Sequence, residues 1–280
     1  MSTAVGVATD STADLRPEVQ ERYGLAMVPL IVNWDGQTFR DKLDLTTRDF
    51  YTRLRASKTL PKTGAPSLAA FETAFREQLK GHAAVVSVNL ASKLSGTYEV
   101  ARKAAESVDP QRISVIDSGS VSVCLGWLAE MAATLANDGL EPAEIVSRLE
   151  EAKGRLRIFA LVETLDFLQR GGRIGRAAAL AGTLLSVKPI LSIRDGEVAP
   201  VERVRTMNGA LRRLVELVVA SGPVERLGVV DADSARNADD VDQQLRAHYP
   251  DMTIDRGELG PVVGTHGGPG VVGVGLLLAR

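Results

Sequence analysis

"AAVVSVNLASKLSGTYEVARKAAESV", residues 83–108, passes from an apolar run through a hydroxyl-rich turn into a helical pattern. Residues 83–90 are rich in valine and almost continuously apolar, which predicts a strand buried on both faces. Residues 97–108 repeat apolar side chains at helical spacing, which predicts a helix. A strand that leads directly into a helix is the unit from which parallel α/β sheets are built.

The same alternation of short apolar runs and longer amphipathic stretches continues on both sides of this segment. Further strands are predicted at residues 4–9 and 113–117. Further helices are predicted at residues 68–79 and 122–138. The first half of the chain is therefore expected to form a parallel sheet covered by helices.

The second half of the chain has a different pattern. Residues 157–200 predict a strand, an aliphatic helix, a glycine–arginine turn, a second helix and a β-hairpin. The hairpin is expected to turn at Asp195-Gly196, because that dipeptide favours a two-residue turn. The next elements are a helix, a strand and a helix at residues 208–222, 226–234 and 238–250, followed by strands with glycine turns.

These patterns predict an α/β protein made of two α/β domains. Residues 1–154 are expected to form a domain with a parallel sheet, and residues 155–280 a domain with a mixed sheet. The sequence has no low-complexity segment and no long linker between them. The two domains should therefore pack closely together.

Composition excludes several classes of protein. The net charge is −2 and aromatic residues make up 4% of the 280 residues, so neither a basic surface nor a base-stacking platform for nucleic acid is expected. Three histidines and one cysteine make a transition-metal site improbable on ligand supply alone. We expect no nucleic-acid partner, no metal and no cofactor.

Cysteine use and hydropathy indicate where such a protein works. Cys124 is the only cysteine, so no intrachain disulfide forms, and its apolar surroundings predict a small buried hydrophobic residue. The longest apolar stretch near the C-terminus, residues 271–279, is shorter than the ~18 residues of a membrane span. The first ten residues lack the pattern of a signal peptide. We therefore expect a cytoplasmic protein with no stable membrane insertion.

The turn between the strand at 83–90 and the helix at 97–108 is the first candidate binding site. Ser95, Gly96 and Thr97 stand at the start of that helix, where free N–H groups and the helix dipole favour an anion. Simple capping of the helix would need only one hydroxyl group. The additional hydroxyl groups favour a bound, negatively charged ligand.

Other polar turns offer further candidates, each with a purely structural alternative. Thr63 lies in the tight turn "KTGAPS", residues 62–67, and His266 in the glycine-rich turn "THGGPG", residues 265–270. Ser11 and Asp14 have the spacing of a capping box. The turn "LQRGGRIGR" adds a cluster of arginines that suit a carboxylate or phosphate, namely Arg170, Arg173 and Arg176.

Several of these motifs, in order along the whole chain, resemble the DegV family of bacterial fatty-acid-binding proteins. The motifs are "TDSTADL", "VPLIVNWDGQTFRD", "DFYTRL", "PKTGAPS", "LASKLSGTYEVA", "VIDS", "FLQRGGRIG", "LLSVKPIL", "RVRT" and "GTHGGPG". Each is weak alone, but their order over the chain is specific.

The resemblance implies a two-domain fold with one long-chain fatty acid held between the domains. Residues 1–154 would carry the carboxylate-binding loops, and residues 155–280 would form the rest of an apolar tunnel. By motif match, Thr63 and Ser95 would hold the carboxylate, Gly96 and Thr97 would add donors, and His266 would lie beside the head group. Gly64, also expected at the carboxylate, stands where the family usually has a serine. Either its backbone N–H replaces the lost hydroxyl, or the affinity for the head group and the choice of ligand differ.

The resemblance also implies a carrier and not an enzyme. Such a protein presents the acyl carboxylate to a separate fatty acid kinase, of the dihydroxyacetone-kinase-like type, which makes acyl-phosphate for phospholipid synthesis. Arg173 and Arg205 would serve partner docking or phosphate handling near the tunnel mouth.

Two alternatives stay open at this point. One is a hydrolase or phosphotransferase that uses Ser95 with His266 on a small anionic substrate, although no Gly-x-Ser-x-Gly elbow is present. The other is a ligand sensor with no kinase partner.

Overall fold

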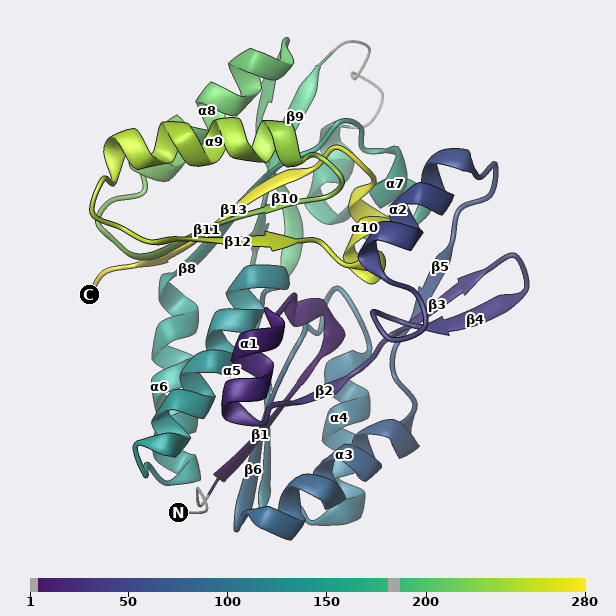
Figure 1. Ribbon diagram of the computed structural model, residues 1–280, viewed down its shortest axis with the longest axis vertical. Coiled ribbons are helices and arrows are strands. Elements are labelled where there is room, and N and C mark those ends of the chain that lie inside the picture. The colour runs from purple at the N-terminus through teal and green to yellow at the C-terminus, as the bar shows by residue number, and fades with distance from the viewer. Residues whose placement is uncertain (1–4, 181–186) are drawn as a thin grey trace.

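The computed structural model describes residues 5–180 and 187–280. Figure 1 shows two sheets in separate halves of the molecule, with a third, smaller sheet beside the junction. The N-terminal end of the described chain lies in the half with the parallel sheet, and the C-terminus lies in the other half. This arrangement is the expected α/β fold with a parallel sheet followed by a mixed sheet.

The first sheet has four strands in the order β2-β1-β6-β7, and every neighbouring pair is parallel. Its strands are β1 (Val5–Asp10), β2 (Ala26–Val28), β6 (Ala84–Asn89) and β7 (Ile113–Asp117). All six residues of β1 are buried, as expected for a strand covered on both faces. The strands predicted around residues 4–9, 83–90 and 113–117 are confirmed.

Helices cover both faces of this sheet. They are α1 (Pro17–Tyr23), α3 (Leu68–Gly81), α4 (Thr97–Val108), α5 (Ser122–Asn137) and α6 (Pro142–Arg155), after a 3₁₀ turn at Ser11–Ala13. On one face, Phe71 and Phe75 of α3 pack with Ala101 of α4 against Val85 of β6. The opposite face carries α5 and α6. The helices predicted at 68–79, 97–108 and 122–138 are confirmed.

A small antiparallel sheet between β2 and α3 was not expected from the sequence. It has the order β4-β3-β5, with β3 (Ile31–Trp34), β4 (Gln37–Arg40) and β5 (Lys62–Gly64), and α2 (Thr47–Ala56) follows β4. Asp35 and Gly36 join β3 to β4, and both have positive φ, as a two-residue hairpin turn requires. The Asp35-Gly36 dipeptide in the sequence is therefore the local signal for this hairpin.

The second large sheet has six strands in the order β10-β9-β8-β13-β11-β12. They are β8 (Leu156–Leu161), β9 (Lys188–Arg194), β10 (Glu197–Val204), β11 (Val224–Asp231), β12 (Ile254–Glu258) and β13 (Val272–Leu278). Only β11 and β12 pair in parallel, so the sheet is mixed, as predicted. Asp195 and Gly196 form the predicted hairpin turn with φ of 53° and 77°.

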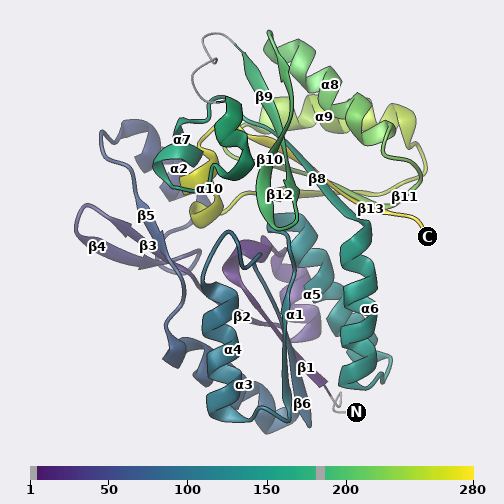
Figure 2. The same cartoon turned by 180° about the vertical axis from the view of Figure 1, so that it is seen from behind.

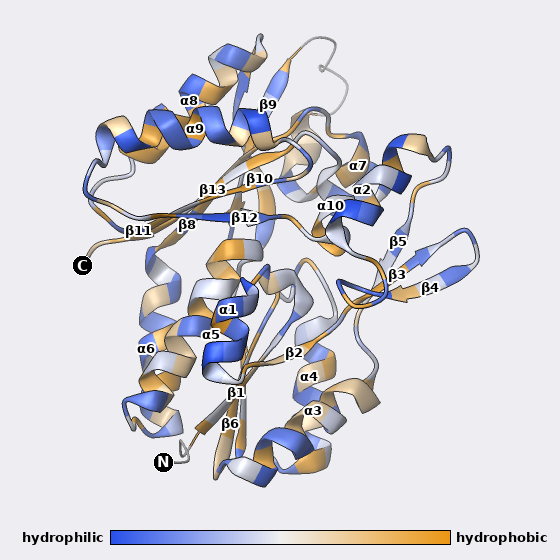
Figure 3. Cartoon of the chain, in the orientation of Figure 1, coloured by the Kyte–Doolittle hydropathy of each residue, from blue (hydrophilic) through white to orange (hydrophobic). Residues whose placement is uncertain are grey.

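Two long amphipathic helices cover the outer face of this sheet. These are α8 (Met207–Val219) and α9 (Ala235–His248), close to the predicted helices. Figure 2 shows them from behind, away from the parallel-sheet half, and Figure 3 shows their mixed polar and apolar surfaces. The apolar side chains include Leu211, Leu214 and Val241, which are buried against the sheet.

Two predictions for the second half need correction or fall outside the structure. Residues 261–267, read as glycine turns, form a helix, α10 (Pro261–Gly267), because Pro261 suits a first helical turn and Gly268 ends it with φ of 77°. Of the segment 157–200, Asp166–Arg170 forms α7 and Gly175–Leu180 a 3₁₀ helix. The second predicted helix begins in this 3₁₀ helix, and most of the rest of it falls on residues 181–186, outside the described residues. The first three residues of "LLSVKPIL" also fall there, whereas its last four lie in β9.

One apolar core extends from the parallel-sheet half into the mixed-sheet half. Leu125 and Leu128 of α5 belong to the same buried cluster as Ile158 of β8 and Val230 of β11. Cys124 is fully buried, and burial raises the pKa of its thiol to about 12, so it is the inert hydrophobic residue expected. The division into domains 1–154 and 155–280 stays a prediction.

Within residues 5–180 and 187–280, no helix has the length and apolar character needed to cross a membrane.

A substitution at Gly126 tests how closely α5 packs against the turn after β1. A Cβ at Gly126 would lie 2.6 Å from the carbonyl oxygen of Ala13, so α5 would have to move. We expect Gly126→Ala to lower the free energy of unfolding by about 1–3 kcal/mol in a denaturant titration.

Gly154 in α6 is the matched control, since a Cβ there meets no atom within 4 Å. Gly154→Ala should raise the free energy of unfolding by up to ~1 kcal/mol through helix propensity. Equal effects of the two substitutions would contradict the packing argument.

Candidate functional site

An apolar cavity lies at the junction of the two halves. Its volume is about 140 Å³, measured for the centres of water-sized molecules, several times the ~10–15 Å³ that one water needs. Aliphatic side chains from both halves line it: Leu30, Leu90, Leu94, Val121, Ile158, Ala160, Val162, Leu168, Leu191, Ile193, Val198, Val230, Leu259, Val262, Val263 and Val271. None of the described lining residues is aromatic or acidic. The cavity suits an aliphatic ligand.

Four polar side chains singled out in the sequence line the same cavity. These are Thr63, Ser95, Arg173 and His266. Thr63 comes from β5 of the small sheet, and His266 from the last turn of α10. The Oγ1 atom of Thr63 lies 2.7 Å from Nε2 of His266, so the fold joins two residues that are 203 positions apart.

The imidazole of His266 is held neutral. Burial, together with the smaller effect of the nearby positive charge of Arg173, lowers the pKa of His266 to about 4. Its Nδ1 atom is buried and has no hydrogen-bond partner among the described residues. A buried N–H without an acceptor is costly, so the proton belongs on Nε2, which then donates to Thr63. The hydroxyl proton of Thr63 is left free to donate to a ligand.

Ser95 combines a structural role with a position on the cavity wall. Helix α4 begins at Thr97, as the sequence predicted, and its N-cap is Gly96. The Oγ atom of Ser95 accepts the backbone N–H of Thr97 at 3.3 Å and lies 2.9 Å from Oγ1 of Thr97. Gly96 and Thr97 do not themselves line the cavity. Thr97 therefore fixes the hydroxyl group of Ser95, which faces the cavity.

The two arginines expected near the site lie in different places. Arg173 lines the cavity and donates to the carbonyl oxygens of Leu94 at 3.1 Å and Gly171 at 2.8 Å. It thereby fastens the turn after α7 to the loop that precedes α4. Arg205 is exposed in the turn between β10 and α8 and does not line the cavity.

Gly64 follows Thr63 in β5 but does not line the cavity. Successive side chains of a strand point to opposite faces, so a serine here would point away from the site that Thr63 faces. A Cβ at Gly64 would lie 3.7 Å from Cβ of Ile31, an ordinary packing distance. The missing serine therefore leaves no gap in the cavity wall.

The geometry does not favour a nucleophile–base pair. His266 is bonded to Thr63, and Ser95 to Thr97, with no hydrogen bond between Ser95 and His266 in the described structure. No carboxylate there orients the imidazole, since Nδ1 of His266 has no partner. A triad needs both contacts. Among the same residues, no group of three histidine, cysteine or acidic side chains is placed to hold a metal ion.

Two features of the site were not recognised from the sequence. Gly171 packs beside His266, and any Cβ there would collide with Nδ1 of the ring. The paired glycines of the arginine turn were the available signal.

The predicted capping box at Ser11 and Asp14 is wrong, because Asp10 caps the 3₁₀ turn, Ser11 bonds Asp41, and Asp14 reaches distant segments.

The chain is similar in sequence to known proteins over nearly its whole length. The family model described as "Uncharacterised protein, DegV family" matches residues 4–279. Protein DegV from Bacillus subtilis is 34% identical over 274 residues, which cover 96% of this chain and 98% of that protein.

Solved structures show the same fold. A fatty-acid-binding DegV family protein from Thermus thermophilus superposes with a TM-score of 0.93 at 30% identity, covering 99% of this chain and 100% of the other. DegV from Bacillus subtilis, a fatty acid binding protein, gives a TM-score of 0.90 at 34% identity, covering 99% and 100%. A stearic-acid-binding protein from Eubacterium ventriosum gives 0.88 at 27% identity, covering 98% of each. The chain belongs to the DegV family.

Proposed function

We propose that this protein binds one long-chain fatty acid in the cavity and presents its carboxylate to a separate fatty acid kinase. The observation that carries the proposal is an aliphatic cavity whose lining includes Thr63, Ser95, Arg173 and His266, the polar cluster of the proposal. Its other polar lining residues are Thr12, Ser122 and Ser192. The structural neighbours that bind fatty acids, stearic acid among them, support the choice of ligand.

Burial of the acyl tail supplies the affinity. Each buried methylene contributes ~0.8 kcal/mol, so a tail of about fourteen methylenes gains roughly 11 kcal/mol before ordering costs. Aliphatic walls such as those formed by Leu191, Val198 and Val262 provide that burial without polar groups to desolvate. The tail therefore sets how tightly the ligand binds.

The polar cluster determines which ligands bind and how they are oriented. A carboxylate that leaves water needs hydrogen-bond donors, because an unpaired buried charge costs several kcal/mol. The hydroxyl groups of Thr63 and Ser95 would donate to it, with neutral His266 fixing the hydroxyl of Thr63. The guanidinium of Arg173 supplies the positive charge. Gly96 and Thr97 act through the position of Ser95.

The content of the site supports presentation to a kinase. A donor set for a carboxylate, without a nucleophile–base pair, suits a protein that holds the acid for another enzyme. The kinase would use ATP to form the acyl-phosphate, and the exposed Arg205 would contact the kinase or a phosphate. The protein would then work in the cytoplasm and feed phospholipid synthesis.

Lipid extraction and binding of added palmitate test the ligand. We expect native mass spectrometry of the purified protein to show one bound acyl chain. Ser95→Ala should weaken palmitate binding by about 1–3 kcal/mol, because one hydrogen bond to a charged group is lost. Ser92→Ala is the matched control, since Ser92 is exposed and lies outside the cavity. Absence of an acyl ligand together with no palmitate binding would refute the proposal.

The protonation of His266 gives a second test. Because its folded pKa of about 4 is below the usual 6.5, the unfolded chain takes up a proton first, and this group's contribution to stability is lost as pH falls from ~6.5 toward 4. We expect NMR of the ring to show a midpoint near 4, with His266→Gln identifying the signal. A midpoint near 6.5 would mean that the ring of His266 is solvated and that the polar cluster is accessible to water.

Arg205→Ala separates presentation from binding. We expect palmitate affinity to stay unchanged and the rate of acyl-phosphate formation with the kinase to fall severalfold, because an interface charge is lost. Arg148→Ala, on the exposed side of α6 in the other half, is the control and should leave the rate unchanged. Equal rates for the two variants would remove Arg205 from the interface.

A further inference from the structure

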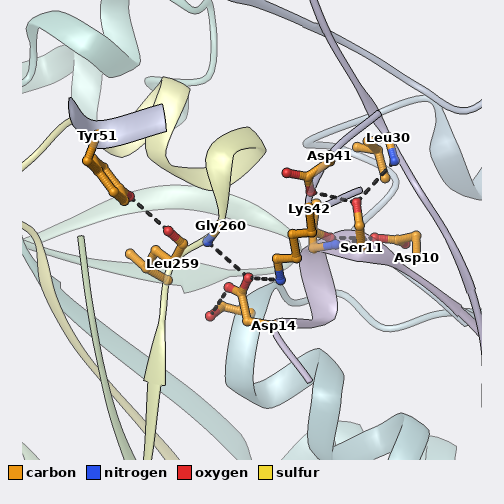
Figure 4. A network of polar contacts seen from close by, with 11 residues as sticks. Asp10, Ser11, Asp14, Leu30, Asp41, Lys42, Tyr51, Leu259 and Gly260 are labelled. Carbon is orange, nitrogen blue, oxygen red and sulfur yellow. Dashed lines mark hydrogen bonds and ion pairs between the residues drawn. The ribbon is translucent and has the colours of Figure 1, made fainter. Parts of the chain in front are cut away.

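Helix α10 carries His266 in its last turn, and its first turn is held by side chains from distant parts of the chain. Figure 4 shows the ammonium of Lys42, which follows β4, directed at Asp14, which follows β1, and Asp14 in turn bonded to the backbone of Gly260. Gly260 is the N-cap of α10. The two ends of this short helix are therefore fixed by different groups.

Asp14 is the centre of the contacts at the first turn. Its Oδ1 atom accepts from Nζ of Lys42 at 2.6 Å and from the backbone N–H of Gly260 at 3.1 Å. Its Oδ2 atom accepts from the hydroxyl of Ser122 at 2.6 Å, at the start of α5. The side chain of Asp14 is 1% exposed, so these bonds form out of contact with water. Such charge-assisted bonds are short and directional.

Tyr51 of α2 holds the residue before the cap. Its hydroxyl donates to the carbonyl oxygen of Leu259 at 2.9 Å, and its ring is buried. The same helix packs against Gly264, where a Cβ would collide with the hydroxyl of Tyr51. The position of α10 is thus set from its first turn to its middle, before the chain reaches His266.

The positive charge of Lys42 interacts favourably with two buried carboxylates. Besides Asp14, it attracts Asp41, whose carboxylate is buried and accepts from Ser11 at 2.6 Å. Oδ1 of Asp41 has no hydrogen-bond partner within the described ranges. Loss of Lys42 would leave two acids facing each other across the start of α10. Lys42 is therefore the most informative position to alter.

We infer that Asp14 and Lys42 are positioning residues, which act through α10 to hold His266 against Thr63 and so set the preference for a carboxylate head group. The inference rests on the proposed function. We call Asp14 and Lys42, with their contacts to Gly260, the clamp. Gly260 and His266 are six positions apart, so at 1.5 Å per residue the clamp acts over about 9 Å. A helix of seven residues has little stability of its own, so its ends must be fixed by tertiary contacts.

The test compares palmitate with its methyl ester, which has the same tail and no charge. In the unaltered protein, we expect palmitate to bind more tightly than the ester. Lys42→Met should reduce palmitate affinity by about five- to tenfold and ester affinity by less than about twofold, because the tail contacts remain. Asp14→Asn, which keeps an acceptor for the N–H of Gly260, should act in the same direction. Lys42→Arg should restore the preference.

Lys153→Met is the matched control. Lys153 has a side chain 22% exposed against 20% for Lys42, and it also forms an ion pair, with Glu150 on α6. It should change neither affinity. A preference for palmitate that survives Lys42→Met and Asp14→Asn unchanged would overturn the inference.

NMR of the ring of His266 in the ligand-free protein gives a readout that does not depend on lipid. We expect the pKa of His266 to rise from about 4 toward its ordinary value in Lys42→Met, and to stay near 4 in Lys153→Met. If the unaltered protein binds neither palmitate nor ester, the proposed function fails, while the titration still decides whether the clamp positions His266. An unchanged pKa in Lys42→Met would overturn the clamp.

Discussion

The contact between Thr63 and His266 is the interaction on which the site depends. It joins the small sheet inserted in the first half of the chain to a helix near the end of the second, over 203 positions of sequence. An acid can leave water only where donors replace its hydration, and a hydroxyl oriented by a neutral imidazole is such a donor. The apolar walls would accept any aliphatic molecule, so under the proposed function the polar cluster would distinguish an acid from other ligands.

Much of the fold follows from local pattern. The strand at Ile113–Asp117 and the hairpin at Asp195-Gly196 were predictable because burial on both faces selects valine and isoleucine, and a tight turn selects Asp-Gly. Thr63, Ser95 and His266 could be named as unusual polar residues in turns. Their assignment to one site came only from the resemblance to a family, because spacing in sequence does not show that β5 and α10 meet.

The remaining features depend on contacts between distant segments. The glycines of "THGGPG" suggested turns, whereas packing against α2 stabilises a helix there. Asp14 looked like part of a local cap, but its partners Lys42, Ser122 and Gly260 come from three other segments. The cavity walls could not be told from ordinary core, since both consist of valine, leucine and isoleucine, and only the backbone arrangement leaves a space between them.

The core shared by α5, β8 and β11 limits how the molecule can move. Parting the two halves would undo the packing of Val123 and Trp127 of α5 against Gly228 and Gly275 of the second sheet. Exposing a large apolar side chain of this kind costs roughly 1.5–3 kcal/mol. Separation of the two halves is therefore opposed by this shared apolar packing. A guest molecule would then enter more cheaply by local displacement of the segments that cover the cavity than by separation of the halves, and its rate of exchange would depend on those segments.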